Sequence, residues 1–166
     1  IAQNYICELI ELMNHDLLEE DIVYGDETTI NCLEFKDRFK SYIWVRCNSP
    51  SAKRQIRLFD FSKGRDFESC KKLYEGYQGY IHCDAYSTYR QLENVTIVAC
   101  MAHARRYVYE AIDTNKLYVL YKKLPDDSSR KTFLDEHGSF KILVDLLGMI
   151  DDLFKLERNY KAEGLD

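Results

Sequence analysis

A chain of 166 residues, with 46% hydrophobic residues and a formal net charge of −5, has the size and composition of one folded domain, which excludes disordered and fibrous classes. The negative charge weighs against a module that binds nucleic acid by bulk electrostatic attraction, but not against an enzyme that contacts DNA locally. No run approaches the ~18 consecutive apolar residues of a membrane span, so no membrane association is expected.

In the first part of the chain, a helix pattern is followed by three strand patterns. An apolar stripe predicts an N-terminal helix over residues 1–19, and a β-branched run predicts a strand over 22–33 with Asp26 in its middle. Residues 41–47 alternate as a second strand and residues 55–61 as a third. Their short connections indicate an antiparallel meander.

Helices and strands alternate further along the chain. The patterns predict, in order, a helix over 67–77, a strand over 80–83, a small helix over 86–92, a buried strand over 95–100 and a helix over 103–113. A helical insertion spans about 114–140, in which residues 122–139 form a polar, solvent-facing connection, and a last helix covers 140–160.

These elements predict an α/β fold with a mixed sheet of about five strands flanked by helices. Their order is that of a ribonuclease H-like domain, with a helical insertion before the last helix and a single domain over residues 1–166. The chain opens on Ile1 inside a helical pattern, so it is expected to be a fragment of a longer protein. Its six scattered cysteines favour reduced, mostly buried thiols over a disulfide framework.

Two aspartates stand where a charge is costly. Asp26 sits inside an apolar strand and Asp84 ends another, and an uncompensated carboxylate there loses several kcal/mol of solvation. A divalent cation such as Mg²⁺, which prefers carboxylate oxygens, would compensate this loss. For either aspartate alone, a solvated position at a sheet edge or turn is the more common explanation.

A third acid is expected from the last helix. Glu157 continues the apolar stripe of Leu146 and Ile150, so the helical period turns it inward. A frayed helix end would leave it solvated instead. The competing candidate, Glu110, falls outside the apolar arc of its own helix and lies four residues from Arg106, a spacing typical of a surface ion pair.

Four segments together resemble a known family. GDETT at residues 25–29, HCDAY at 82–86, CMAHARR at 100–106 and LER at 156–158 are similar to successive blocks of the insertion-sequence-66 transposases, which read approximately ADET, DGY, CWAHARR and YxIE. The blocks cover nearly the whole chain. In place of the family's usual residues the chain carries Gly25 for Ala, Ala85 for Gly and Met101 for Trp, and none of these changes removes a ligand.

The resemblance implies the catalytic core of a bacterial DDE transposase that cleaves DNA and transfers strands. Asp26, Asp84 and Glu157 would be the catalytic residues and would hold two Mg²⁺ or Mn²⁺ ions. One ion would activate the attacking water or 3′-hydroxyl, and the other would stabilise the leaving oxygen. The implied partners are insertion-sequence ends and target DNA, with a homo-oligomer as the active complex, N-terminal DNA-binding regions outside the fragment, and a cytoplasmic, nucleoid-associated location.

The segment CMAHARR offers further candidates. His103, Arg105 and Arg106 could contact phosphates near the scissile bond. The simpler interpretation of His103 is a helix cap or a core histidine. For Arg105 and Arg106 it is a solvated helix face. Zinc held by Cys83, Cys100 and His103 is weakly indicated, because the spacing lacks a pair.

Three alternatives remain open from the sequence. The chain could be another ribonuclease H-like nuclease or resolvase, which would share the carboxylates but not the CMAHARR segment. It could be a non-catalytic DNA-binding relic of a transposase, which would predict a missing ligand. It could also be an ordinary α/β domain whose carboxylates are unrelated surface groups.

Overall fold

A computed structural model describes residues 2–33, 40–84 and 86–164. The chain divides into two units, Ile1–Cys100 and Met101–Asp166, each of which is described by itself. Ala85, one of the departures from the family pattern, lies outside the described residues. The single domain over 1–166 therefore stays a prediction.

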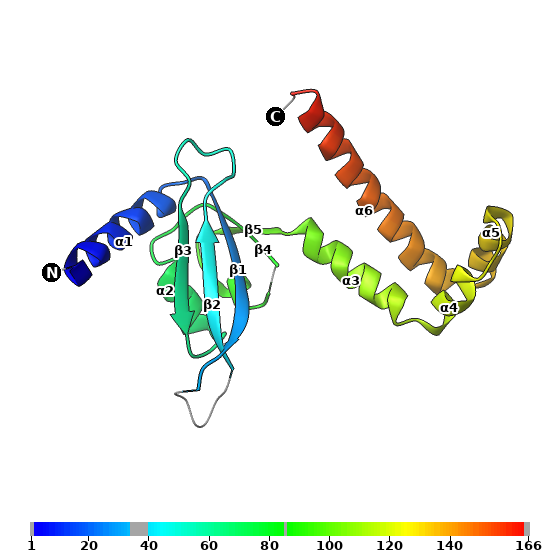
Figure 1. Cartoon of the computed structure of the whole chain (residues 1–166), viewed down its shortest axis with the longest axis horizontal. Helices are drawn as coiled ribbons and strands as arrows, with labels where there is room; N and C mark the ends of the chain where they lie inside the picture. Colours follow the sequence, from blue (N-terminus) through cyan, green and yellow to red (C-terminus); the bar gives the residue numbers. More distant parts are fainter. Residues whose placement is uncertain (1, 34–39, 85, 165–166) are drawn as a thin grey trace. The chain divides into compact units, whose positions relative to one another are not determined.

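The first unit contains the sheet. In the described part of the chain, its elements are α1 (Ala2–Leu18), β1 (Ile22–Asn31), β2 (Lys40–Cys47), β3 (Arg57–Ser62), α2 (Phe67–Leu73), β4 (Tyr80–Cys83), the 3₁₀ turn η1 (Tyr89–Gln91) and β5 (Thr96–Ala99) (Figure 1). These bounds confirm the predicted strands to within about two residues, which is the usual uncertainty of element ends. The helix predicted over 67–77 ends earlier, and the small helix over 86–92 is a single turn.

Five strands of the described chain form one mixed sheet, in the order β3-β2-β1-β4-β5. The pairs β1–β2 and β2–β3 are antiparallel, as the meander predicts, whereas β1–β4 and β4–β5 are parallel. This confirms the mixed α/β fold and is consistent with a ribonuclease H-like sheet. β5 was predicted as a buried strand, and that was wrong: β5 is an edge strand whose Thr96, Val98 and Ala99 are exposed.

The hydrophobic core of the first unit lies on one face of the sheet. Aromatic side chains dominate it: Trp44 of β2 and Tyr89 of η1 are almost fully buried, and Tyr74 packs against Tyr89 with ring centroids 6.1 Å apart. The remaining core side chains come from α1, α2, the strands and the segments beside β3 and α2, and comprise Leu17, Val23, Ile56, Leu58, Cys70, Tyr77, Ile81 and Cys83.

Arg46 of β2 ties the N-terminal helix to this core. Its guanidinium is buried and donates to Asp60 on β3 at 2.9 Å, to Asn14 on α1 at 2.7 Å and to the carbonyl oxygen of Leu73. One guanidinium thus joins α1, β3 and the end of α2.

The second unit is helical throughout its described residues. It contains α3 (Met101–Asp113), α4 (Lys116–Lys122), α5 (Asp127–Glu136) and α6 (Gly138–Ala162), and both α3 and α5 pack against α6 (Figure 1). Residues 122–139 are solvent-facing, as predicted, but they are not a plain connection, because α5 occupies most of this stretch. Asp126 caps α5 by accepting a hydrogen bond from the Ser129 amide at 2.7 Å. The polar residues 125–129, whose composition is typical of a turn, therefore form the start of a helix. The helical character of the insertion is confirmed.

All six cysteines are free thiols. Only Cys70 and Cys83 are buried, so the expectation of mostly buried thiols was wrong. Among the described residues, no helix is long and apolar enough to cross a bilayer.

Candidate active site

The first two candidate ligands lie on neighbouring parallel strands. Pairing of β1 with β4 extends to Tyr24 and His82. Asp26 lies two residues further along β1, and Asp84 lies two residues further along the chain, directly after β4 ends at Cys83. Asp26 and Asp84 are therefore level with one another, at the carboxyl end of β4. The carboxyl ends of parallel strands are where α/β sheets bind their ligands.

Asp26 and its neighbour Glu27 face opposite sides of β1. Val23 and Gly25 are buried on the core side, and the period of two places Glu27 on that side and Asp26 on the other. The Glu27 side chain is 1% exposed, while Asp26 is exposed. Asp26 also accepts a hydrogen bond from the Glu27 amide at 2.9 Å. The two adjacent acids of β1 thus differ in their surroundings: Glu27 is buried on the core side, and Asp26 is exposed on the other side.

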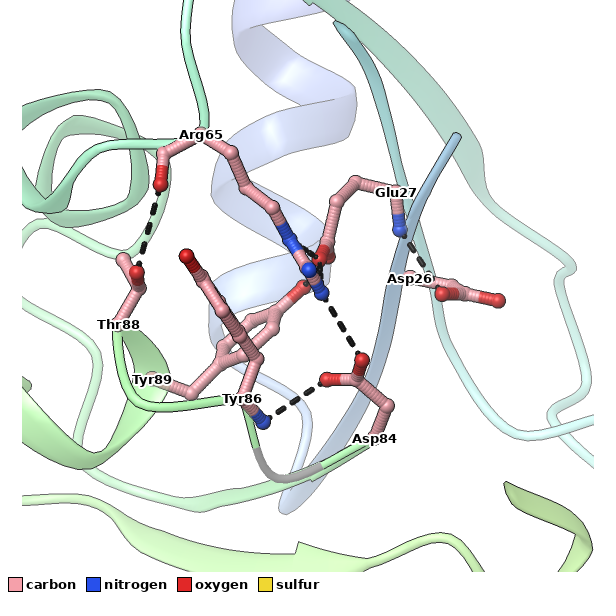
Figure 2. A network of polar contacts seen from close by, with 7 residues as sticks. All are labelled: Asp26, Glu27, Arg65, Asp84, Tyr86, Thr88 and Tyr89. Carbon is pink, nitrogen blue, oxygen red and sulfur yellow. Dashed lines mark hydrogen bonds and ion pairs between the residues drawn. The ribbon is translucent and has the colours of Figure 1, made fainter. Parts of the chain in front are cut away.

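Arg65, in the segment between β3 and α2, connects the buried acid to the second aspartate (Figure 2). Its guanidinium donates to Glu27 Oε1 and, at 2.9 Å, to Asp84 Oδ2. The same guanidinium stacks over the ring of Tyr86, 3.5 Å from the centroid. Arg65 thus forms an ion pair with both carboxylates at once.

Each carboxylate has a second partner. Tyr89 donates its hydroxyl to Glu27 Oε2 at 2.7 Å, and the amide of Tyr86 donates to Asp84 Oδ1 at 2.9 Å (Figure 2). Burial raises the pKa of Glu27 above its ordinary value, and this effect outweighs the hydrogen bond from Tyr89 and the charge of Arg65, which lower it. Burial also raises the pKa of the Tyr89 hydroxyl, which keeps it a hydrogen-bond donor.

Asp26 and Asp84 suit a hard divalent cation. Both supply carboxylate oxygens, the donors that Mg²⁺ prefers. Each Asp84 oxygen accepts one hydrogen bond, from Arg65 or from the Tyr86 amide, and retains a second lone pair for a cation. Within the described ranges, no three His, Cys, Asp or Glu side chains are grouped closely enough to hold a metal ion. The described residues therefore place no third His, Cys, Asp or Glu ligand beside Asp26 and Asp84. They also give no support to zinc held by Cys83, Cys100 and His103.

The third candidate acid belongs to the second unit. Glu157 lies near the end of α6, where its side chain is exposed and accepts a hydrogen bond from Lys161 at 2.8 Å. The expected inward orientation is not found within that unit. The reason is the length of α6: Arg105 of α3 pairs with Asp151, and Glu157 lies beyond the point where α3 begins. Its catalytic role stays a prediction.

The candidate DNA-contacting residues lie in the first turns of α3. Arg105 donates to Asp151 of α6 at 2.6 Å, a contact that raises the pKa of Arg105 and lowers that of Asp151. Arg106 lies 3.8 Å from Glu110, which confirms the surface ion pair expected from their spacing. His103 is partly buried in the same helix.

The network around Arg65 could not be read from local patterns. Glu27 carries a partial signal, since a period of two from the buried Val23 predicts that it faces the core. Arg65 carries none, because the segment Ser62-Lys63-Gly64-Arg65-Asp66 has the composition of any solvated loop.

The strand order, together with a carboxylate on β1 and another directly after the parallel strand β4, is consistent with a ribonuclease H-like domain with an acidic candidate site. The family model described as Transposase IS66 family matches residues 1–163, so the chain belongs to the Transposase IS66 family. No curated protein and no solved structure matches the chain. Membership supports a DDE transposase-like function, with DNA as the implied partner, and favours it over other ribonuclease H-like nucleases.

Proposed function

We propose that the chain is the catalytic core of a transposase that cleaves phosphodiester bonds at insertion-sequence ends and transfers the strands to target DNA. The observation that carries this proposal is the placement of Asp26 on β1 and of Asp84 directly after the neighbouring parallel strand β4, in a chain that matches the family over residues 1–163. Glu157 is the proposed third acid, and Glu110, already paired with Arg106, is the weaker candidate.

In this proposal Asp26, Asp84 and Glu157 would hold two Mg²⁺ or Mn²⁺ ions, which would activate the attacking oxygen and stabilise the leaving one. The chain's own residues hold the carboxylates in place, and Arg106, Arg105 and His103 contact phosphates beside the scissile bond. The proposed location is the bacterial cytoplasm, and the active complex a homo-oligomer on DNA.

The proposal is tested first by a crystal structure after a Mn²⁺ soak, read from the anomalous density. Metal held jointly by Asp26 and Asp84, with Glu157 facing it, is the expected result. Carboxylates on different faces of the domain, with no shared metal, would contradict it.

Activity gives the second test. In the transposase, Asp84→Asn should abolish cleavage of the element's ends while leaving the thermal unfolding transition in place. Glu157→Gln should do the same, and Glu110→Gln should remain active. Cleavage near the parent rate in the Asp84 variant would contradict the catalytic role of Asp84. An inactive Glu110→Gln with an active Glu157→Gln would make Glu110 the third acid.

A further inference from the structure

The segment that carries Arg65 is held at several points. The Asp66 side chain caps α2 by accepting from the Ser69 amide at 2.9 Å, and Ser62 accepts from the Gly64 amide at 3.1 Å. The backbone carbonyl of Arg65 accepts from the hydroxyl of the buried Thr88 at 3.5 Å. Anchors on both sides of Arg65 direct its side chain toward the carboxyl end of β4.

Glu27 is the anchor for the guanidinium itself. With 1% of its side chain exposed, it is buried between Arg65 and Tyr89, and both of its oxygens accept hydrogen bonds from them. It faces the core side of β1, away from Asp26, and its two oxygens already accept from Arg65 and Tyr89. Its contacts fix Arg65.

Asp84 is the second carboxylate that the Arg65 guanidinium contacts. The Asp84 side chain is 13% exposed, and its two oxygens are held separately by Arg65 and by the Tyr86 amide. An aspartate has few side-chain torsions, so two hydrogen bonds from different directions select one orientation. We propose that Arg65 is a positioning residue that, anchored by Glu27, fixes the Asp84 carboxylate for cation binding, an inference that rests on the proposed function.

Arginine suits this role because its planar guanidinium holds several N–H donors in a fixed, fork-like arrangement. Nε and Nη2 contact Glu27 while Nη2 also reaches Asp84, and the flat guanidinium stacks on Tyr86. A lysine ammonium has the same charge without the planar fork. Arg65→Lys therefore holds the local charge constant and removes the geometry.

The test compares the parent chain with Arg65→Lys in two measurements. Crystal structures without metal give the orientation of Asp84, and electron paramagnetic resonance of free Mn²⁺ in a titration gives cation affinity. Asp84 should change orientation or adopt several in the variant, and Mn²⁺ affinity should fall about tenfold, as for lost partners of metal ligands. Arg90→Lys, on the exposed side of η1, is the matched control and should change neither.

A second variant guards against misfolding. Glu27→Gln combined with Arg65→Gln removes the buried ion pair as a unit, leaves the net charge unchanged, and should weaken Mn²⁺ binding by a similar factor. An unchanged Asp84 orientation in either folded variant, or Mn²⁺ binding as tight as in the parent, overturns the positioning role. If the parent binds no Mn²⁺ that Asp84→Asn abolishes, the proposed metal site fails, and the Asp84 orientation still decides the role of Arg65.

Discussion

Gly25 lies directly against the hydroxyl of Tyr74, so close that a Cβ at position 25 would overlap it. The Tyr74 hydroxyl is buried and has no hydrogen-bond partner among the described residues. A side chain at the position directly before Asp26 would therefore require Tyr74 to move.

Gly25→Ala should therefore destabilise the protein by about 2 kcal/mol, within the range for overpacked cores. Tyr74→Phe alone should be neutral or stabilising, because it removes a buried hydroxyl that makes no hydrogen bond. In the Tyr74→Phe background, Gly25→Ala should cost little. Urea denaturation of the two single variants and the double variant measures the coupling, and additive effects would contradict the contact.

The raised pKa of Glu27 should make the free energy of unfolding fall as pH rises. Burial raises its pKa above the ordinary value of 4.5, so the folded state binds the extra proton between that value and the raised one. Stability from this group is then present at low pH and is lost as pH rises through the folded-state pKa.

Glu27→Gln, which mimics the protonated acid, should remove this loss. The difference in unfolding free energy between variant and parent should grow from pH 4.5 upward, as measured by urea denaturation at a series of pH values. A parent that gains stability relative to the variant over this range would show that the ion pair with Arg65 outweighs burial.

The ion pair between Arg46 and Asp60 should contribute far more than a surface pair. Arg46 is 4% exposed at its side chain, so Asp60→Ala leaves a buried charge with only neutral partners, at a cost of about 3 kcal/mol. The pair of Arg54 and Asp16 is the control: Arg54 is 82% exposed, and Arg54→Ala should cost less than about 1 kcal/mol. Equal costs in thermal or urea unfolding would contradict the difference in burial.

Arg106 should contact DNA more than Arg105 does. Its partner Glu110 lies 3.8 Å away on an exposed helix face, whereas Arg105 donates to Asp151 at 2.6 Å. Arg106→Ala should weaken DNA binding and reduce the slope of log affinity against log salt by about 0.9, the value for one phosphate contact. Lys155→Ala removes the same charge from α6 and should leave that slope unchanged; an equal effect would indicate bulk electrostatics.

Much of the first unit follows from local patterns. The β-branched run around Asp26, the alternation of residues 41–47 and the short connections predicted three antiparallel strands, and the structure confirms them. The failures have physical causes. Burial of β5 depends on its place at the sheet edge, and the start of α5 depends on a cap at Asp126 that resembles a turn.

The sequence by itself determined the five strands, the mixed α/β class and the family, because apolar periods and motif order are properties of consecutive residues. The tertiary structure alone decided which acids share a neighbourhood. Arg65 meets Glu27 and Asp84 across 38 and 19 positions of the chain, a contact that only the strand order creates. No local pattern carries such a contact, because its energy arises when the sheet and core exclude water from charges that are separate in the unfolded chain.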